Sequence, residues 1–201
     1  MVDERGEVVD GDQIMVMTAL DLHARGLLRN DAVAVTVMSN LGLRHALRDA
    51  GVRVVETPVG DRNVLIALDE HDLVLGGEQS GHIVFRDHAT TGDGLLTGLF
   101  VLDLVRRAQR PLSELAAVMT RYPQVLVNVR VGRRPDLDHA PEIGTAVRDA
   151  ESRLGDEGRV LVRASGTEPV VRVMVEAASH EMADAEAGRL VTAVEAAFGG
   201  S

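Results

Sequence analysis

Cysteine and lysine are both absent from this 201-residue sequence, and each absence removes a class of chemistry. Without cysteine, the chain can form neither a disulfide nor a thiolate metal site. All 21 basic residues are arginine, so no lysine can serve as a base or as a Schiff-base nucleophile. An anion site in this chain must therefore use arginine side chains, helix N-termini or backbone amides.

Aromatic residues and long apolar runs are also scarce. Aromatics make up 2% of the chain, so a core must be built from Val, Leu, Ala, Ile and Met. No apolar run approaches the roughly 20 residues that span a bilayer, and the first residues show no signal-peptide apolar region. The net charge of −10 disfavours nucleic acid as a partner. We expect a cytoplasmic protein without a nucleic-acid or membrane partner.

The first part of the chain alternates between strand and helix patterns. Residues 32–38 (AVAVTVM) form a continuous apolar run, which is typical of a parallel strand covered on both faces. This alternation predicts an α/β domain over residues 12–121, with a mostly parallel sheet and helices on both faces. The expected strands are 32–38, 52–59, 72–75 and 83–85, and the expected helices are 13–26, 41–50, 61–68, 95–109 and 111–122.

After Pro123 the pattern changes to half-exposed strands. Residues 124–131 (QVLVNVRV) alternate apolar and polar side chains, as does a strand with one face in a core. The order β-α-β-β-α, with helices at 142–154 and 181–198, predicts a small α+β domain over residues 122–201 with its helices on one face.

A glycine-rich loop at residues 76–82 (GGEQSGH) carries several reactive groups. Glu78, Ser80 and His82 supply a carboxylate, a hydroxyl and an imidazole, and the glycines let a ligand approach the backbone. Glu78 and Ser80 would point the same way on an extended backbone, which suits the vicinal hydroxyls of a sugar. The same composition also fits a plain surface hairpin, and the residues alone leave both interpretations open.

A second loop has the composition of a phosphate site. Arg163, Ser165, Gly166 and Thr167 combine a guanidinium, two hydroxyls and a glycine, and Arg172 follows in the next strand. An ordinary hairpin turn with one edge-strand arginine is the alternative. Weaker patterns, at residues 10–12, 60–62 and 92–94, are more typical of helix caps than of ligand or metal loops.

Taken together, these stretches resemble the α-D-phosphohexomutase superfamily, and most closely its phosphoglucosamine mutase branch. The resemblance covers nearly the whole chain, in the family's order. It rests on residues 36–43 (TVMSNLGL), 60–62 (GDR), 77–82 (GEQSGH) and 163–169 (RASGTEP), supported by 9–12 (VDGD) and 91–94 (TGDG).

The resemblance implies an isomerase that interconverts glucosamine 6-phosphate and glucosamine 1-phosphate through a phosphoserine and a bisphosphorylated intermediate, with Mg²⁺ assisting. By the family's pattern the loop residues bind a hexosamine phosphate, and a homodimer is a candidate assembly. Glu78, Ser80 and Arg62 would bind the sugar, His82 would lie near the reacting end, and the non-reacting phosphate would be held by Arg163, Ser165, Gly166, Thr167 and Arg172.

The departures from the family's pattern restrict this expectation. The phosphoserine loop and the metal loop are not in the sequence, so neither a catalytic nucleophile nor the Mg²⁺ ligands are assigned. We expect the carboxy-terminal half of such an enzyme, inactive alone and lacking its amino-terminal domains, with residues 1–11 as the tail of the second domain. Asn63, directly after Arg62, stands where the family usually has an aromatic residue. The alternatives are a phosphomannomutase or phosphoglucomutase fragment, or a non-catalytic sugar-phosphate-binding protein.

Overall fold

A computed structural model describes residues 1–132, 135–166 and 168–199, except for the side chain of Asp138. The chain divides into two compact units, Met1–Arg121 and Tyr122–Ser201. Each unit has its own hydrophobic core. The assignment of residues 1–11 to a preceding domain stays a prediction.

The first unit is built on a mixed four-stranded sheet with the strand order β2-β1-β3-β4. β1 pairs in parallel with both β2 and β3, and β4 closes the edge in the antiparallel direction. The predicted mostly parallel sheet is therefore confirmed. Its strands are β1 (Ala32–Thr36), β2 (Arg53–Thr57), β3 (Leu75–Gly77) and β4 (Ile83–Phe85), and its helices are α1 (Gly11–Ala24), α2 (Leu41–Asp49), α3 (Asp61–Glu70), α4 (Gly94–Ala108) and α5 (Leu112–Ala116), with a 3₁₀ turn at Arg29–Asp31.

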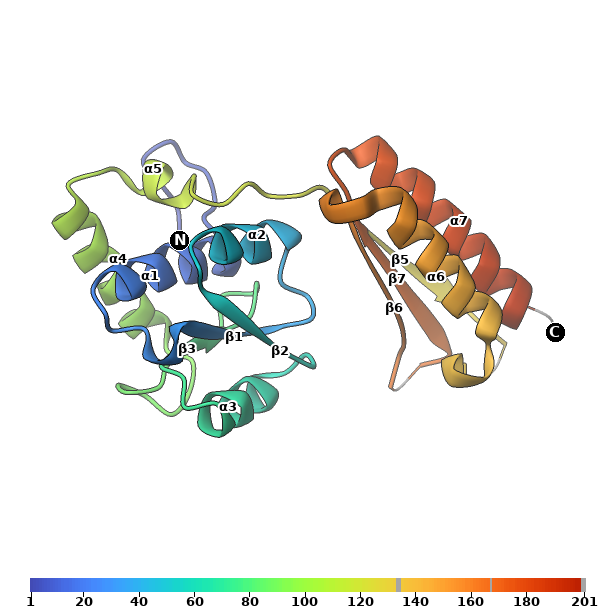
Figure 1. Cartoon of the computed structure of the whole chain (residues 1–201), viewed down its shortest axis with the longest axis horizontal. Helices are drawn as coiled ribbons and strands as arrows, with labels where there is room; N and C mark the ends of the chain where they lie inside the picture. The colour runs from blue at the N-terminus through green and yellow to red at the C-terminus, as the bar shows by residue number, and fades with distance from the viewer. Residues whose placement is uncertain (133–134, 167, 200–201) are drawn as a thin grey trace. The chain divides into compact units, whose positions relative to one another are not determined.

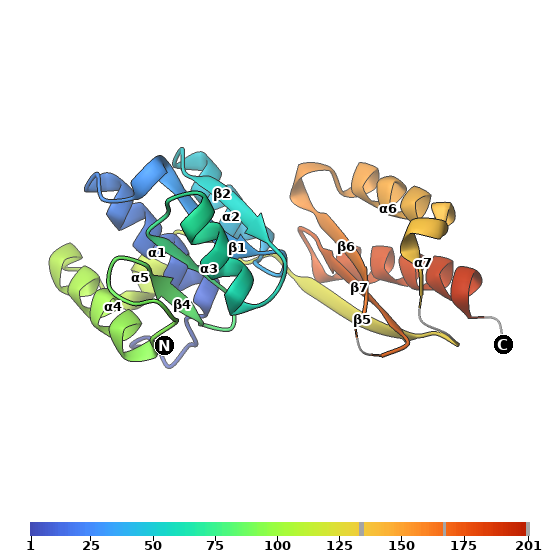
Figure 2. The ribbon, with the colours of Figure 1, turned by 90° about the horizontal axis from the view of Figure 1, so that it is seen from below.

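The central strand β1 explains why helices cover both faces. Val33 and Val35 belong to the core formed with α1, α4 and α5, whereas Ala32 and Ala34 belong to the core formed with α3. Because successive side chains point to opposite faces, an unbroken apolar strand must be covered on both sides. Figures 1 and 2 show α3 on one side of the sheet and α1 on the other.

One predicted helix is shorter than expected. The sequence pattern predicts a helix from Pro111 to near Tyr122, but α5 ends at Ala116. There the chain tightens into a turn in which Met119 N–H donates to the Ala116 carbonyl. This turn lets Met119 join Leu115 in the core, and burial of its side chain outweighs a further helical turn.

The second unit is a three-stranded antiparallel sheet with the order β5-β7-β6. Val171, Val173 and Val175 on the central strand pack into a core with the two helices, and Figures 1 and 2 show both helices on the same face. The predicted α+β arrangement is confirmed. Its elements are β5 (Gln124–Arg130), α6 (Pro141–Leu154), β6 (Arg159–Ala164), β7 (Val170–Glu176) and α7 (His180–Phe198), with 3₁₀ turns at Leu137–His139 and Gly155–Glu157. No helix in the described ranges is long and apolar enough to cross a membrane.

The start of α1 presses directly on the glycine-rich loop. Gly11 N–H donates to the Gln79 carbonyl at 3.0 Å, and a Cβ at position 11 would lie 2.3 Å from the Glu78 carbonyl oxygen. Asp10 fixes this helix start through a capping box with Gln13. The absence of a side chain at Gly11 therefore sets where the loop lies.

We predict that Gly11→Ala destabilises the first unit by about 1–3 kcal/mol, because the added methyl has only backbone atoms to displace. Gly98→Ala is the matched control in α4, where a Cβ meets nothing within 4 Å. In that control the better helix propensity of alanine should stabilise by roughly 0.5–1 kcal/mol. Urea unfolding of both variants measures the difference, and equal stabilities would contradict the steric argument.

A second prediction concerns the carboxylate of Glu186, whose side chain is 7% exposed between α6 and α7. Arg153 donates to it through Nε and Nη2 at 2.9 and 2.8 Å, and Arg189 donates to the same carboxylate. Hydrogen bonds from Arg153, with the charges of both arginines, lower the pKa of Glu186. Its stabilising contribution is therefore complete above the unfolded pKa and is lost as the pH falls through the folded pKa.

Glu186→Gln should lower the stability of the second unit by about 1 kcal/mol at pH 7, and the deficit should shrink as the pH falls below the unfolded carboxyl pKa of about 4.3. The measurement is urea unfolding followed by the amide NMR signals of α7. Glu151→Gln on α6 is the control, because Glu151 is exposed and forms no ion pair within the described ranges. A deficit that is independent of pH would refute the prediction.

Candidate functional site

A hollow of about 450 Å³ lies beyond the carboxyl ends of the parallel strands of the first unit. The chain leaves β1 towards β2 on one side, whereas β3 lies on the other side of β1. Open α/β sheets bind ligands at such a switch point, because the loops diverge there and leave a crevice. The lining residues are Asp10, Thr36, Met38, Val59, Glu78, Gln79, Ser80 and Arg121.

Glu78 is held in this hollow by hydrogen bonds from three directions. Its Oε1 accepts from Gly60 N–H at 3.0 Å, which ties the loop to the turn before α3. Its backbone N–H donates to the His82 carbonyl, and its carbonyl accepts from Gly81 N–H, both at 3.0 Å. Gly81 has a φ of 96°, a backbone conformation that glycine adopts without strain. The loop is therefore a fixed turn with one carboxylate oxygen occupied.

Ser80 and Arg62 are the least constrained of the predicted sugar-binding residues. Ser80 is exposed and lines the hollow, with no side-chain hydrogen bond to the described residues. Arg62 is exposed in the first turn of α3 and does not line the hollow. Asn63, the departure from the family's pattern, donates to the Val59 carbonyl at 2.9 Å and so closes the turn that carries Arg62.

His82 lies at the other end of the glycine-rich loop. Its Nε2 accepts a hydrogen bond from Gly92 N–H at 3.2 Å, and the same atom is 4.0 Å from Asp61 Oδ2. The turns at Asp61 and at Gly92, whose sequence patterns predict helix caps, thus both lie near this imidazole. The cap predicted at Asp61 is wrong, because α3 has Gly60 as its N-cap and no side-chain cap. Asp93 does cap α4, through its Oδ1 and Leu96 N–H at 2.9 Å.

The hollow also contains a charged pair that the sequence patterns do not predict. Asp10 Oδ1 accepts from Gln13 N–H as the cap of α1, and its Oδ2 is 3.6 Å from Arg121 Nη1. The arginine side chain is 63% exposed and comes from the last residue of the unit. The cap pattern identified Asp10, but no local signal pairs residues so far apart in the chain.

The second candidate site surrounds the turn between β6 and β7. Ser165 is buried, and its backbone N–H donates to the Val170 carbonyl at 2.8 Å. Its hydroxyl oxygen accepts from Glu168 N–H at 3.3 Å, which leaves the hydroxyl proton to be donated. Gly166 is exposed, and Thr167 lies outside the described residues.

Arg163 and Arg172 face each other directly across the antiparallel pair β6–β7. Val171 and Val173 point to the helices, so these two arginines lie on the opposite face of the sheet. Neither forms an ion pair with a described residue, and Arg172 Nε is buried without a hydrogen-bond partner there. Burial and the charge of Arg172 lower the pKa of Arg163. Two like charges in this arrangement would be stabilised by an anion.

Asn128 extends this polar row onto the third strand. It is the register partner of Arg172 on β5, so the order across the sheet is Asn128, Arg172, Arg163. The alternation in residues 124–131 predicts that Asn128 faces away from the core. Its position beside the two arginines depends on strand register, which the alternation alone does not determine.

The described residues bring no three His, Cys, Asp or Glu side chains together in a way that could hold a metal ion. The predicted capping role of Asp10 is confirmed, and Asp12 is buried and accepts from Asn40 N–H at 2.8 Å. The described residues therefore do not offer the set of oxygen ligands that Mg²⁺ needs.

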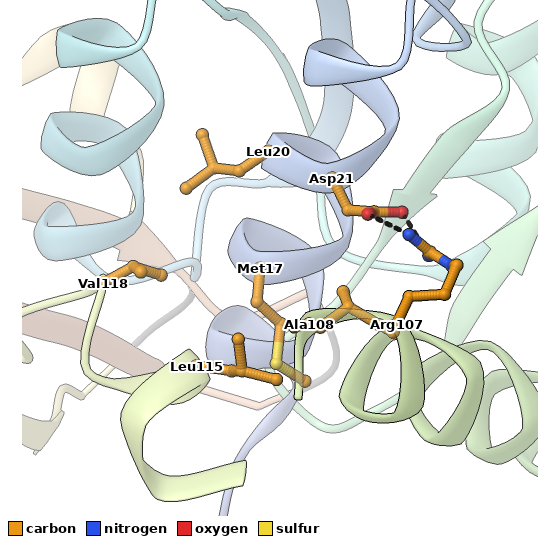
Figure 3. Close-up of a pocket in the computed structure, with 8 residues that line it drawn as sticks. Met17, Leu20, Asp21, Arg107, Ala108, Leu115 and Val118 are labelled. Atoms are coloured by element: carbon orange, nitrogen blue, oxygen red, sulfur yellow. Dashed lines mark hydrogen bonds and ion pairs between the residues drawn. The ribbon is translucent and has the colours of Figure 1, made fainter. Parts of the chain in front are cut away.

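Figure 3 shows a second hollow in the first unit, about 260 Å³ in volume, between α1, α4 and α5. Its two charged residues satisfy each other, since Arg107 Nη1 and Nη2 each donate to Asp21 at 2.7 Å. Burial would raise the pKa of Asp21, but hydrogen bonds from Arg107 and Arg25 outweigh it and hold this pKa below its usual value. The remaining lining is apolar, so this hollow offers no unpaired charge to a polar ligand.

Comparison with known proteins places both units in one family. Residues 10–122 match the family model "Phosphoglucomutase/phosphomannomutase, alpha/beta/alpha domain III", and residues 126–193 match "Phosphoglucomutase/phosphomannomutase, C-terminal domain". Phosphoglucosamine mutase of Frankia alni is 59% identical over 98% of this chain, and that of Saccharopolyspora erythraea is 57% identical over 97%. The chain spans 43% and 44% of these relatives.

Solved structures show the same fold. N-acetylphosphoglucosamine mutase of Aspergillus fumigatus is 25% identical over 98% of this chain and 46% of the other, with a TM-score of 0.82. A second structure of that enzyme, in complex with GlcNAc-6P and magnesium, gives a TM-score of 0.79. This chain is thus a homologue of the phosphoglucosamine mutases, and it belongs to the phosphoglucomutase/phosphomannomutase family, of which it carries domain III and the C-terminal domain.

Proposed function

We propose that this chain is the substrate-recognition part of a phosphoglucosamine mutase, the enzyme that interconverts glucosamine 6-phosphate and glucosamine 1-phosphate. In this proposal the first unit binds the sugar and the second binds a phosphate group. The observation that carries it is the pair Arg163–Arg172, two facing cations without a carboxylate partner among the described residues. In a chain with a net charge of −10, such a pair implies an anionic ligand.

The phosphate is assigned to the loop between β6 and β7. The guanidinium groups of Arg163 and Arg172 supply charge and forked donors, and the Ser165 hydroxyl has a proton to donate. Gly166 is exposed, and a Cβ added there would meet nothing within 4 Å, so a phosphate oxygen can approach its backbone from that side. Thr167 completes the proposed set by the family's pattern.

The sugar is assigned to the hollow beyond the sheet. Glu78 has one oxygen bound to Gly60 N–H, which leaves the other to accept from a sugar hydroxyl. Ser80 lines the same hollow without a side-chain hydrogen bond to described residues and can donate or accept. His82 is proposed to lie near the reacting phosphate. Arg62, exposed beside this loop, is proposed only as an outer contact of the sugar.

The chemical step is assigned to parts of the enzyme that this sequence does not contain. Relatives at 59% identity are more than twice as long, because the chain spans 43% of their length. The family's phosphoserine and Mg²⁺ would belong to the amino-terminal domains, which are the proposed partners of this chain together with the hexosamine phosphate. A cytoplasmic location is proposed from the similarity to phosphoglucosamine mutases. The homodimer stays a prediction.

Calorimetry with glucosamine 6-phosphate tests the proposal. We expect binding by the parent chain and a loss of tenfold or more in Arg163→Ala, because a charge-assisted hydrogen bond contributes about 1.5–3 kcal/mol. Arg148→Ala on α6 removes the same charge from an exposed position and should bind as the parent does. No binding by the parent, or equal losses in both variants, would overturn the proposal.

Two further ligands separate the two assigned roles. Inorganic phosphate should compete with glucosamine 6-phosphate in the parent but bind poorly to Arg163→Ala. Glu78→Gln keeps the size of the side chain and removes the charge that accepts from a sugar hydroxyl. It should weaken glucosamine 6-phosphate binding while leaving inorganic phosphate unaffected. If Glu78→Gln weakened both ligands equally, the assignment of sugar to the first unit would be wrong.

We predict that the purified 201-residue chain does not convert glucosamine 6-phosphate into glucosamine 1-phosphate, because positioning alone cannot replace the phosphoserine that would accept and return the phosphoryl group. The measurement is ³¹P NMR of the sugar phosphates after prolonged incubation with Mg²⁺ and glucose 1,6-bisphosphate as a phosphoryl source. A full-length relative provides the positive control. Product formation above the buffer rate would refute this prediction.

A further inference from the structure

The imidazole of His82 is held by a backbone amide rather than by a side chain. Gly92 N–H donates to Nε2 at 3.2 Å. A backbone amide can only donate, so Nε2 must present its lone pair to this bond. The hydrogen bond made by one ring nitrogen decides which nitrogen carries the proton, and a neutral His82 in this arrangement is therefore protonated at Nδ1.

The contact depends on the absence of a side chain at position 92. A Cβ there would lie 2.6 Å from both Cε1 and Nε2 of the imidazole, which is closer than non-bonded atoms approach. The backbone beyond it is fixed as well. Asp93 N–H is 3.4 Å from the Ile83 carbonyl, and the Asp93 side chain caps α4. The turn at residues 92–93 is thus held by the contact of Gly92 with the ring and by the contacts of Asp93 with Ile83 and α4.

Asp61 is the residue that would favour the other tautomer of His82, with the proton on Nε2. Its Oδ2 is 4.0 Å from Nε2, beyond hydrogen-bond distance, and a carboxylate can only accept. A ring protonated at Nε2 would be drawn towards Asp61, and Gly92 N–H would lose its acceptor. The observed bond to Gly92 and the longer separation from Asp61 both favour the ring with its proton on Nδ1.

We propose that Gly92 is a positioning residue that holds His82 as the Nδ1–H tautomer, so that the ring donates Nδ1–H to an oxygen of the bound sugar phosphate. Within the described ranges Nδ1 makes no hydrogen bond or ion pair, which leaves this donor for a ligand. The tautomer follows from the geometry alone. Its use in binding a sugar phosphate rests on the proposed function.

The tautomer is measured directly by long-range ¹H–¹⁵N NMR of the chain labelled at its seven histidines. The spectrum is recorded at pH 8, where a free imidazole with a pKa of about 6.5 is neutral. The signals of His82 are those that vanish in His82→Gln. We expect a protonated Nδ1 and an unprotonated Nε2. A protonated Nε2 in the parent chain would overturn the inference, whatever the chain binds.

Two glycine variants, one in the turn at residues 92–93 and one at the first residue of α4, separate positioning from general loss of structure. In Gly92→Ala the methyl displaces the ring, so the His82 signals should move towards the Nε2–H pattern. Gly94→Ala is the control, because a Cβ at position 94 meets nothing within 4 Å, and its His82 signals should match those of the parent. The other six histidines report whether each variant is folded. Unchanged His82 signals in a folded Gly92→Ala would contradict the inference.

Calorimetry with glucosamine 6-phosphate then tests the ligand contact. Gly92→Ala should bind about tenfold more weakly than Gly94→Ala, which is the effect expected for one hydrogen bond to a charged group. Equal affinities would refute the donor role even if the tautomer is as inferred. If the parent chain binds no sugar phosphate, the proposed function and the donor role fall together, whereas the tautomer still stands or falls on the NMR result.

Discussion

Close backbone approach at the glycine-rich loop is the constraint on which the first candidate site depends. The first turn of α1 lies against the backbone of this loop with no room for a Cβ at Gly11, and a Cβ at Gly92 would lie 2.6 Å from the His82 ring. Backbone contacts are more rigid than contacts between long side chains, because they involve few rotatable bonds. As a result Asp10 and Glu78, which are far apart in the sequence, line the same hollow in fixed positions. When a ligand binds to such a site, the protein loses little conformational entropy, because its binding groups are already ordered.

The charge environment of Arg163 and Arg172 differs from that of the arginines held in ion pairs. Arg107 and Arg153 are each bonded to a carboxylate, as expected in a chain with 31 acidic residues and 21 basic ones. Arg163 and Arg172 instead face each other, and burial lowers the pKa of Arg163 further. A bound anion would offset the free-energy cost of this arrangement. This makes the strand pair β6–β7 the most informative electrostatic feature of the chain.

The sequence was sufficient for features that depend on local patterns. The apolar run of β1 predicted cover on both faces, and the alternation in β5 predicted a half-exposed strand, because side-chain period follows directly from backbone geometry. Contacts across long sequence separations were not predictable in this way. The pairing of Asn128 with Arg172 depends on strand register. Asp10 and Arg121 come together only when the whole first unit has folded. The end of α5 was also missed, because core burial of Met119 outweighs its local helical pattern.

The turn at Gly92 and Asp93 shows how one short segment can serve both the fold and the site. Asp93 begins α4 by accepting from Leu96 N–H, a local role that its sequence pattern predicts. The same turn directs Gly92 N–H to His82 and places Asp93 N–H beside the Ile83 carbonyl. Since α4 packs against α1, any shift of that helix would move the amide that fixes the imidazole. The proton position on His82 is therefore coupled to the packing of the whole first unit, a dependence that no single motif reveals.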